Sequence, residues 1–92
     1  MEMKEIDIIL IELHRLLTEV KDEGGSDELR SEIQELFARA IPLLMEIDDL
    51  DEMDRIHKNA AKVAGMASYL IVEKSPEIKE FLSLLGIEEI KN

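Results

Sequence analysis

Apolar residues recur at intervals of three and four along almost the whole chain. This spacing places them on one face of a helix, because an α-helix completes a turn about every 3.6 residues. The alternation of apolar and polar residues that is typical of β-strands is not found in the sequence. The pattern therefore predicts an all-α protein.

Glycine, proline and short polar residues divide this pattern into four segments. Gly24-Gly25 suits the end of a helix, and Ser26 or Asp27 offers a side-chain oxygen to cap the next one. A further start is indicated by Ser75-Pro76-Glu77, with a capping serine, a proline at the first helical position and an acid in the first turn. The predicted helices cover about residues 3–21, 27–47, 51–74 and 76–85, with Gly86 after the last one.

The links between these segments are short, which favours antiparallel packing of consecutive helices. A chain of 92 residues is long enough for one hydrophobic core and too short for two domains. We therefore expect residues 1–92 to form a single domain, a four-helix up-down bundle with three longer helices and a short fourth.

Some apolar residues lie outside the main stripes of the first two helices. Ile8 and Ile11 project opposite the stripe of the first helix, near Arg15, and Ile41 and Met45 belong to a second row on the second helix. One interpretation is a secondary core, because a helix with several neighbours buries more than one face. The other is an exposed apolar patch that contacts a partner protein or a second copy, with Arg15 binding an acidic group of the partner. On the second interpretation these five residues form the interaction site.

The third helix carries alanine where leucine is usual in a helical core. Ala60, Ala64 and Ala67 share its inner face, and His57 and Ser68 are polar members of the same helix. Small residues let neighbouring helices approach closely, or they leave a void. Close packing is one interpretation, and a small-molecule pocket lined by His57, Ala64, Ala67 and Ser68 is the alternative.

The charge of the chain excludes two classes of partner. It has 22 acidic and 11 basic residues and a net charge of −11, so its surface repels phosphate backbones and anionic lipids. Its longest apolar run, at residues 8–11, is far shorter than the roughly 20 residues of a membrane span. The first residues lack the pattern of a secretory signal, and we expect a cytoplasmic location unless the chain is synthetic. Neither nucleic acid nor membrane is expected as a partner.

Catalytic and cofactor-binding patterns are weak or missing. The chain contains no cysteine, which excludes disulfides, thiol nucleophiles and cysteine-ligated zinc. His14 and His57 lack the Glu-x-x-His spacing of a di-iron bundle, so we predict no metal site and no cofactor. No serine lies in a Gly-x-Ser-x-Gly turn, and we predict that the protein is not an enzyme.

The whole chain resembles computationally designed helical miniproteins. The resemblance lies in the plain Gly24-Gly25-Ser26-Asp27 connector, the Ser75-Pro76-Glu77 start with Gly86 as stop, and the absence of cysteine and tryptophan. It implies a de novo scaffold or binder that acts through a surface. The sequence therefore favours a protein-interaction module or designed scaffold, with a small-molecule-binding or catalytic bundle as the alternative.

Overall fold

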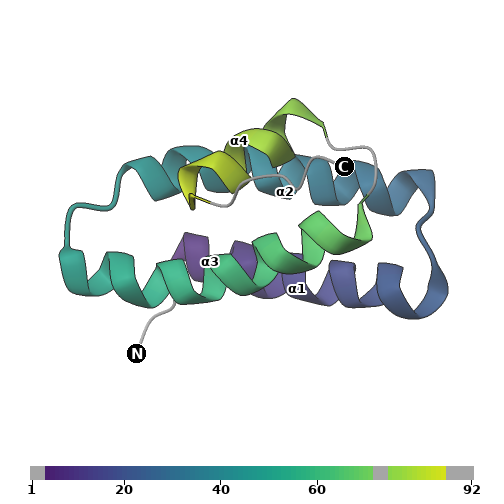
Figure 1. Ribbon diagram of the computed structural model, residues 1–92, viewed down its shortest axis with the longest axis horizontal. Coiled ribbons are helices and arrows are strands. Elements are labelled where there is room, and N and C mark those ends of the chain that lie inside the picture. The colour runs from purple at the N-terminus through teal and green to yellow at the C-terminus, as the bar shows by residue number, and fades with distance from the viewer. Residues whose placement is uncertain (1–3, 72–74, 87–92) are drawn as a thin grey trace.

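The computed structural model describes residues 4–71 and 75–86, and these residues form a bundle of four α-helices without strands (Figure 1). The helices are α1 (Glu5–Glu23), α2 (Asp27–Met45), α3 (Leu50–Leu70) and α4 (Pro76–Leu84). Three have 19 or 21 residues and α4 has 9. The predicted fold class, with three longer helices and a short fourth, is confirmed.

The ends of the helices follow from local capping chemistry. The Ser26 hydroxyl accepts a hydrogen bond from the backbone N–H of Leu29 at 3.1 Å, and the Ser75 hydroxyl accepts one from Ile78 at 3.4 Å. Each bond satisfies a donor that the first turn of a helix leaves without an intrahelical partner. Gly24 ends α1 with a φ of 82°, a conformation that glycine adopts without a steric penalty. The predicted cap at Ser26 and the predicted stop at Gly24 are confirmed.

Two predicted boundaries were wrong by several residues. The third helix was expected to continue to residue 74, but α3 ends at Leu70 because Ile71 is extended, with φ −103° and ψ 109°. The second helix was expected to reach Ile47, but α2 ends at Met45. The Asp49 carboxylate then caps α3 by accepting a hydrogen bond from the N–H of Asp51 at 3.0 Å. The predicted start of the first helix at residue 3 lies outside the described residues, as do residues 72–74 of the predicted third helix.

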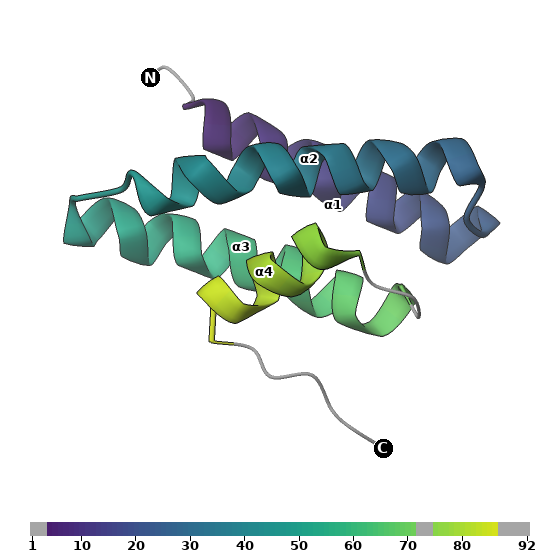
Figure 2. The same ribbon diagram turned by 90° about the horizontal axis from the view of Figure 1, so that it is seen from above.

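Consecutive helices run in opposite directions and enclose one core (Figures 1 and 2). Within the described residues, α1 contacts α2 and α3, α4 contacts the same two helices from the other side, and α1 does not contact α4. The order around the bundle is therefore α1, α2, α4, α3. In this arrangement α1 and α4 occupy opposite corners.

The core contains residues from all four helices. Phe37 of α2 and Phe81 of α4 meet edge to face near its centre, with ring centroids 4.7 Å apart and an interplanar angle of 67°. The inner alanines of α3, Ala60, Ala64 and Ala67, have no exposed surface, as close helix packing requires. The remaining fully or almost fully buried apolar side chains are Ile6, Ile9, Leu10, Leu13, Leu16, Leu17, Ile33, Ala40, Ile41, Ile56, Val63, Ile78 and Leu82.

Ion pairs join the first turns of α1 to its neighbours. The buried Asp7 carboxylate accepts two hydrogen bonds from the Arg55 guanidinium, at 2.7 and 3.2 Å, and these bonds raise the pKa of Arg55. Lys4 pairs with Glu52 in the same region. These contacts fix the N-terminal ends of α1 and α3 side by side. Among the helices that the structure describes, none is long and apolar enough to cross a membrane.

Candidate functional site

The outer face of α1 exposes two large apolar side chains. Ile8 is 54% exposed and Ile11 is 58% exposed, and they lie one turn apart on the helix. The expectation that both point away from the core is confirmed. Their role as partner contacts stays a prediction.

Arg15, the predicted polar member of this face, already has an intrahelical partner. Its guanidinium donates to the Glu12 carboxylate, with a distance of 3.1 Å from Nε to Oε1. This hydrogen bond lowers the pKa of Glu12 and raises the pKa of Arg15. A partner's acidic group would have to compete with Glu12 for the guanidinium, so Arg15 is less available than the sequence indicates.

Ile41 is not part of an exposed patch. It is only 8% exposed and belongs to the core, so the expectation of an exposed side chain was wrong. The physical reason is that α2 contacts α1 on one side and α4 on the other, and a helix with two neighbours buries more than one face. The secondary-core interpretation is therefore correct at this position.

Met45 is exposed, but it belongs to a different surface from Ile8 and Ile11. With an exposed fraction of 68%, it lies at the rim of an apolar groove of about 110 Å³. The groove lies between the C-terminal end of α2, the N-terminal end of α3 and the C-terminal end of α4. Its lining residues are Leu44, Met45, Ile47, Met53, Ile56, His57, Leu84 and Leu85.

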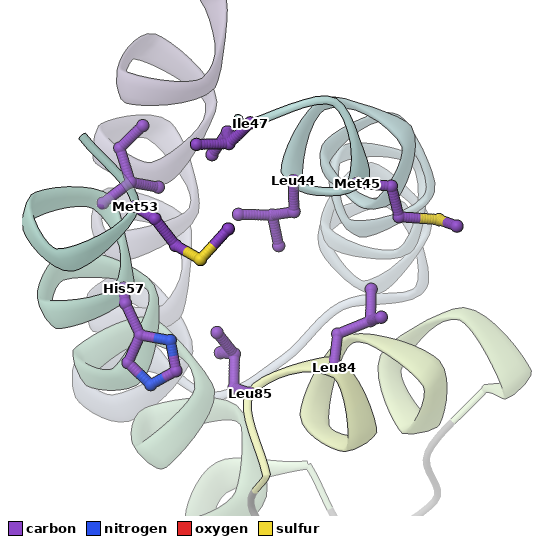
Figure 3. Close-up of a pocket in the computed structure, with 8 residues that line it drawn as sticks. Leu44, Met45, Ile47, Met53, His57, Leu84 and Leu85 are labelled. Atoms are coloured by element: carbon purple, nitrogen blue, oxygen red, sulfur yellow. The ribbon is translucent and has the colours of Figure 1, made fainter. Parts of the chain in front are cut away.

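The side chains of the groove come from three helices and the turn after α2. Figure 3 shows Leu44, Met53 and Leu85 directed into the space between the helices, whereas Met45 extends outward from the end of α2. Met53 and Leu84 are 41% and 43% exposed, although both are large apolar residues. His57 is the one titratable member of the lining. The groove can therefore bind apolar groups, with a single polar side chain at its edge.

The groove lies at the C-terminal end of α4, which is much shorter than the helices it packs against. A helix of 9 residues is about 14 Å long, whereas the 19 residues of α2 extend over about 29 Å. From the start of α4, where Gln34 donates to Glu77 at 3.4 Å, the helix runs along α2 as far as Leu44, one residue before α2 ends. The link between α2 and α3 and the first turn of α3 lie beyond the end of α4 (Figure 2).

Most of the groove was not predicted from the sequence. Of the candidate site residues named from the sequence, only Met45 and His57 line it. The signal present in the sequence was the short fourth segment, because apolar positions beyond its end have no neighbour on a fourth helix.

Two of the four residues predicted to line a small-molecule pocket on α3 are buried in the core. Ala64 and Ala67 are completely buried and Ser68 is half-buried, and of the four residues predicted to line that pocket only His57 lines the groove. The small residues of α3 thus serve helix packing in the structure.

A second depression, of about 230 Å³, lies between α1 and α2. Three of its six lining residues are carboxylates, Glu12, Glu32 and Glu35. Arg39, which also lines it, donates to Glu5 at 3.2 Å. Its charged side chains favour solvent, and the apolar groove is the stronger candidate site.

Metal ligands do not accompany either surface. In the part of the chain that the structure describes, no group of three or more histidine, aspartate or glutamate side chains is placed to hold a metal ion. No protein-family model matches the sequence, and neither a curated protein nor a solved structure is significantly similar to it.

Proposed function

We propose that this protein is a non-enzymatic interaction module that binds a partner protein in the apolar groove at the open end of the bundle. The observation that carries the proposal is that Leu44, Met53 and Leu84, from three different helices, line one apolar groove, with Met45 exposed at its rim. An exposed apolar site on an otherwise highly charged surface is typical of protein-interaction surfaces. The resemblance to designed helical miniproteins supports the same class of function.

The side chains of the groove suit a partner's apolar anchor. Burial of a large apolar side chain stabilises a complex by roughly 1.5–3 kcal/mol before the costs of association. Met45 and Met53 are flexible and polarisable, which lets the groove adapt to the shape of an inserted side chain. A few such contacts are sufficient for a hot spot in a protein interface.

The dimensions of the groove favour a protein over a small molecule. Its volume of about 110 Å³ is below the roughly 300–1,000 Å³ of sites that enclose drug-sized ligands. That volume suits one or two side chains from a partner's surface. The single lining histidine offers few of the polar groups that orient a small ligand.

The outer face of α1 is a second surface for the same class of function, either for a partner or for a homo-oligomer. Ile8 and Ile11 are its anchors, and Arg15 lies one turn further along the helix. Because both isoleucines are exposed, the double variant Ile8→Glu plus Ile11→Glu should keep its fold and lose any association through this face. Light scattering and thermal unfolding on the same sample measure both effects.

The proposal is tested by selecting helical peptides from a display library against the protein. Binders are then measured against the double variant Met53→Glu plus Leu84→Glu, which places two charges in the groove. Tyr69→Glu is the matched control, since Tyr69 is 86% exposed and does not line the groove. Circular dichroism of each variant checks that the helices are retained.

Selected peptides should bind the wild-type protein and the Tyr69→Glu variant with similar affinity. We expect them to lose at least about tenfold in affinity for the groove variant, because apolar contacts are replaced by buried charge. Peptides that bind all three proteins equally would show that the groove is not the interaction site.

A further inference from the structure

We propose that the groove receives a basic amphipathic helix, a helix whose apolar face is flanked by lysine or arginine. This inference rests on the proposed function and specifies the chemistry of the partner. It draws on the unfilled position beyond α4, on the charges around the groove and on the net charge of the chain.

The shape of the site is that of a missing helix segment. In the bundle, α4 occupies the corner opposite α1 and covers α2 and α3, but it ends at Leu84 (Figure 2). At that point Leu44 and Met53 face a space that no described residue fills (Figure 3). A partner helix in this position would bury its apolar face against α2 and α3 in the way that α4 does. A helix suits this space better than an extended segment, since α4 itself packs as a helix against both α2 and α3.

The charged side chains of the segment that leads from α2 into α3, which lines part of the groove, are all acidic. From Ala40 to Asp54 the sequence contains no lysine, arginine or histidine. Its carboxylates include Glu46, Asp48 and Asp51, which are exposed and form no ion pair with any other described residue. Glu46 and Asp48 flank the lining residue Ile47, and Asp51 lies two residues before Met53.

Two other carboxylates of this segment are paired. Asp54 Oδ2 lies 3.6 Å from Nζ of Lys58, and Glu52 pairs with Lys4. Asp49 forms no ion pair with another described residue, and its carboxylate caps α3. The net field at the rim is therefore set by Glu46, Asp48 and Asp51 together with Asp49, and it attracts positive groups of a partner.

The same charge argues against a second copy of this chain as the occupant. Each chain has a net charge of −11, so two copies repel each other unless their contact neutralises acidic groups. Lysine or arginine on a partner helix removes that repulsion and pairs with Glu46, Asp48 and Asp51. Apolar contacts then provide affinity, and the charges decide which helices are accepted.

The experiment uses three synthetic helical peptides with the same apolar face and with lysine, glutamine or glutamate on the flanking positions. Their dissociation constants are measured with the full chain by fluorescence anisotropy at low and high ionic strength. The lysine peptide should bind about tenfold more tightly than the glutamine peptide, and the glutamate peptide more weakly than both. High ionic strength should reduce the advantage of lysine, because exposed charges are screened.

The charge variant is Glu46→Gln, Asp48→Asn and Asp51→Asn in one chain. It should bind the lysine and glutamine peptides with equal affinity. The matched control neutralises three exposed carboxylates at the opposite end of the bundle, Asp22→Asn, Glu23→Gln and Asp27→Asn, and so changes the net charge by the same amount. The control should retain the preference for lysine.

Two sets of outcomes separate this inference from the proposed function. Equal binding of the three peptides, all weakened by Met53→Glu plus Leu84→Glu, would overturn the preference for a basic helix and leave the groove as an interaction site. Binding that Met53→Glu plus Leu84→Glu does not weaken would overturn both. Self-association through the groove, or binding seen only after removal of residues 87–92, would assign the site to another occupant and overturn the inference.

Discussion

Phe81 should be the residue on which both the stability of the core and the shape of the groove depend. It lies at the centre of the nine-residue helix α4, has no exposed surface and meets Phe37 of α2 edge to face at 4.7 Å. Ile78 and Leu82 are the other buried residues of α4. Truncation of Phe81 to alanine therefore removes the largest of the three side chains that attach α4 to the bundle.

The expected cost follows from the burial of Phe81. Phe→Ala changes at fully buried positions destabilise proteins by about 3–5 kcal/mol. Domains of this size have a total stability of roughly 5–14 kcal/mol, and each kcal/mol shifts the melting temperature by about 4–8 °C. We expect Phe81→Ala to lower the melting temperature by roughly 12–40 °C.

Part of this cost should belong to the contact between the two rings. Edge-to-face pairs contribute about 0.5–1.5 kcal/mol beyond the burial of their surface. A double-mutant cycle with Phe37→Leu and Phe81→Leu isolates that energy, because leucine keeps most of the apolar volume. The coupling energy should fall in the same range.

Urea unfolding followed by far-UV circular dichroism measures these effects, with Ser83→Ala as the control on the exposed side of α4. If α4 detaches before the rest of the bundle unfolds, the denaturant dependence of the variant should also decrease. An isolated helix of nine residues is too short to be stable in water, so a detached α4 would lose its helicity. A loss below about 1 kcal/mol for Phe81→Ala would refute the reasoning, because it would mean that α4 is not held by this side chain.

Three further predictions concern α1. Leu13→Ala should cost about 2–5 kcal/mol in urea unfolding, because Leu13 has no exposed surface. Asp7→Asn should cost about 1–2 kcal/mol by the same measurement, since Arg55 then loses a charged acceptor but remains half-exposed. An NMR titration should place the pKa of Glu12 below its ordinary value of 4.5, and Arg15→Gln should raise that pKa again. The Glu12–Arg15 pair contributes to stability at pH values above the ordinary pKa of Glu12. This contribution is lost as the pH falls through the lowered pKa.

The parts of the fold that could be predicted from the sequence are those with local causes. The caps at Ser26 and Ser75 and the stop at Gly24 each depend on one side chain or one backbone angle within a few residues. The end of α3 was misplaced because apolar spacing continues to Val72 in the sequence, while the backbone leaves the helix at Ile71. A pattern of spacing does not show where the chain has to turn.

The candidate site could be predicted only in part, because exposure depends on neighbours that are distant in the chain. Ile8 and Ile41 look alike in a helical projection, yet Ile8 lies on the side of α1 that no helix covers and Ile41 lies where α2 has two neighbours. The ion pair between the buried Asp7 and the half-exposed Arg55, which are 48 residues apart, was missed for the same reason. Which helix covers which face is decided by the length and order of all four helices together.

The length of α4 links the stability of the bundle to its proposed function. Its anchors, Ile78, Phe81 and Leu82, are within five residues, which is enough to close the core over α2 and α3. The helix then ends before Gly86, whose φ of 73° costs about 1–2 kcal/mol for most other residues, so the stop is set locally. Because this stop lies beyond the last anchor, the described core is complete while Met53 and Leu84 stay exposed. The groove therefore depends on where a local helix stop falls relative to the link between α2 and α3, and a partner helix can occupy it without displacing any anchor of the core.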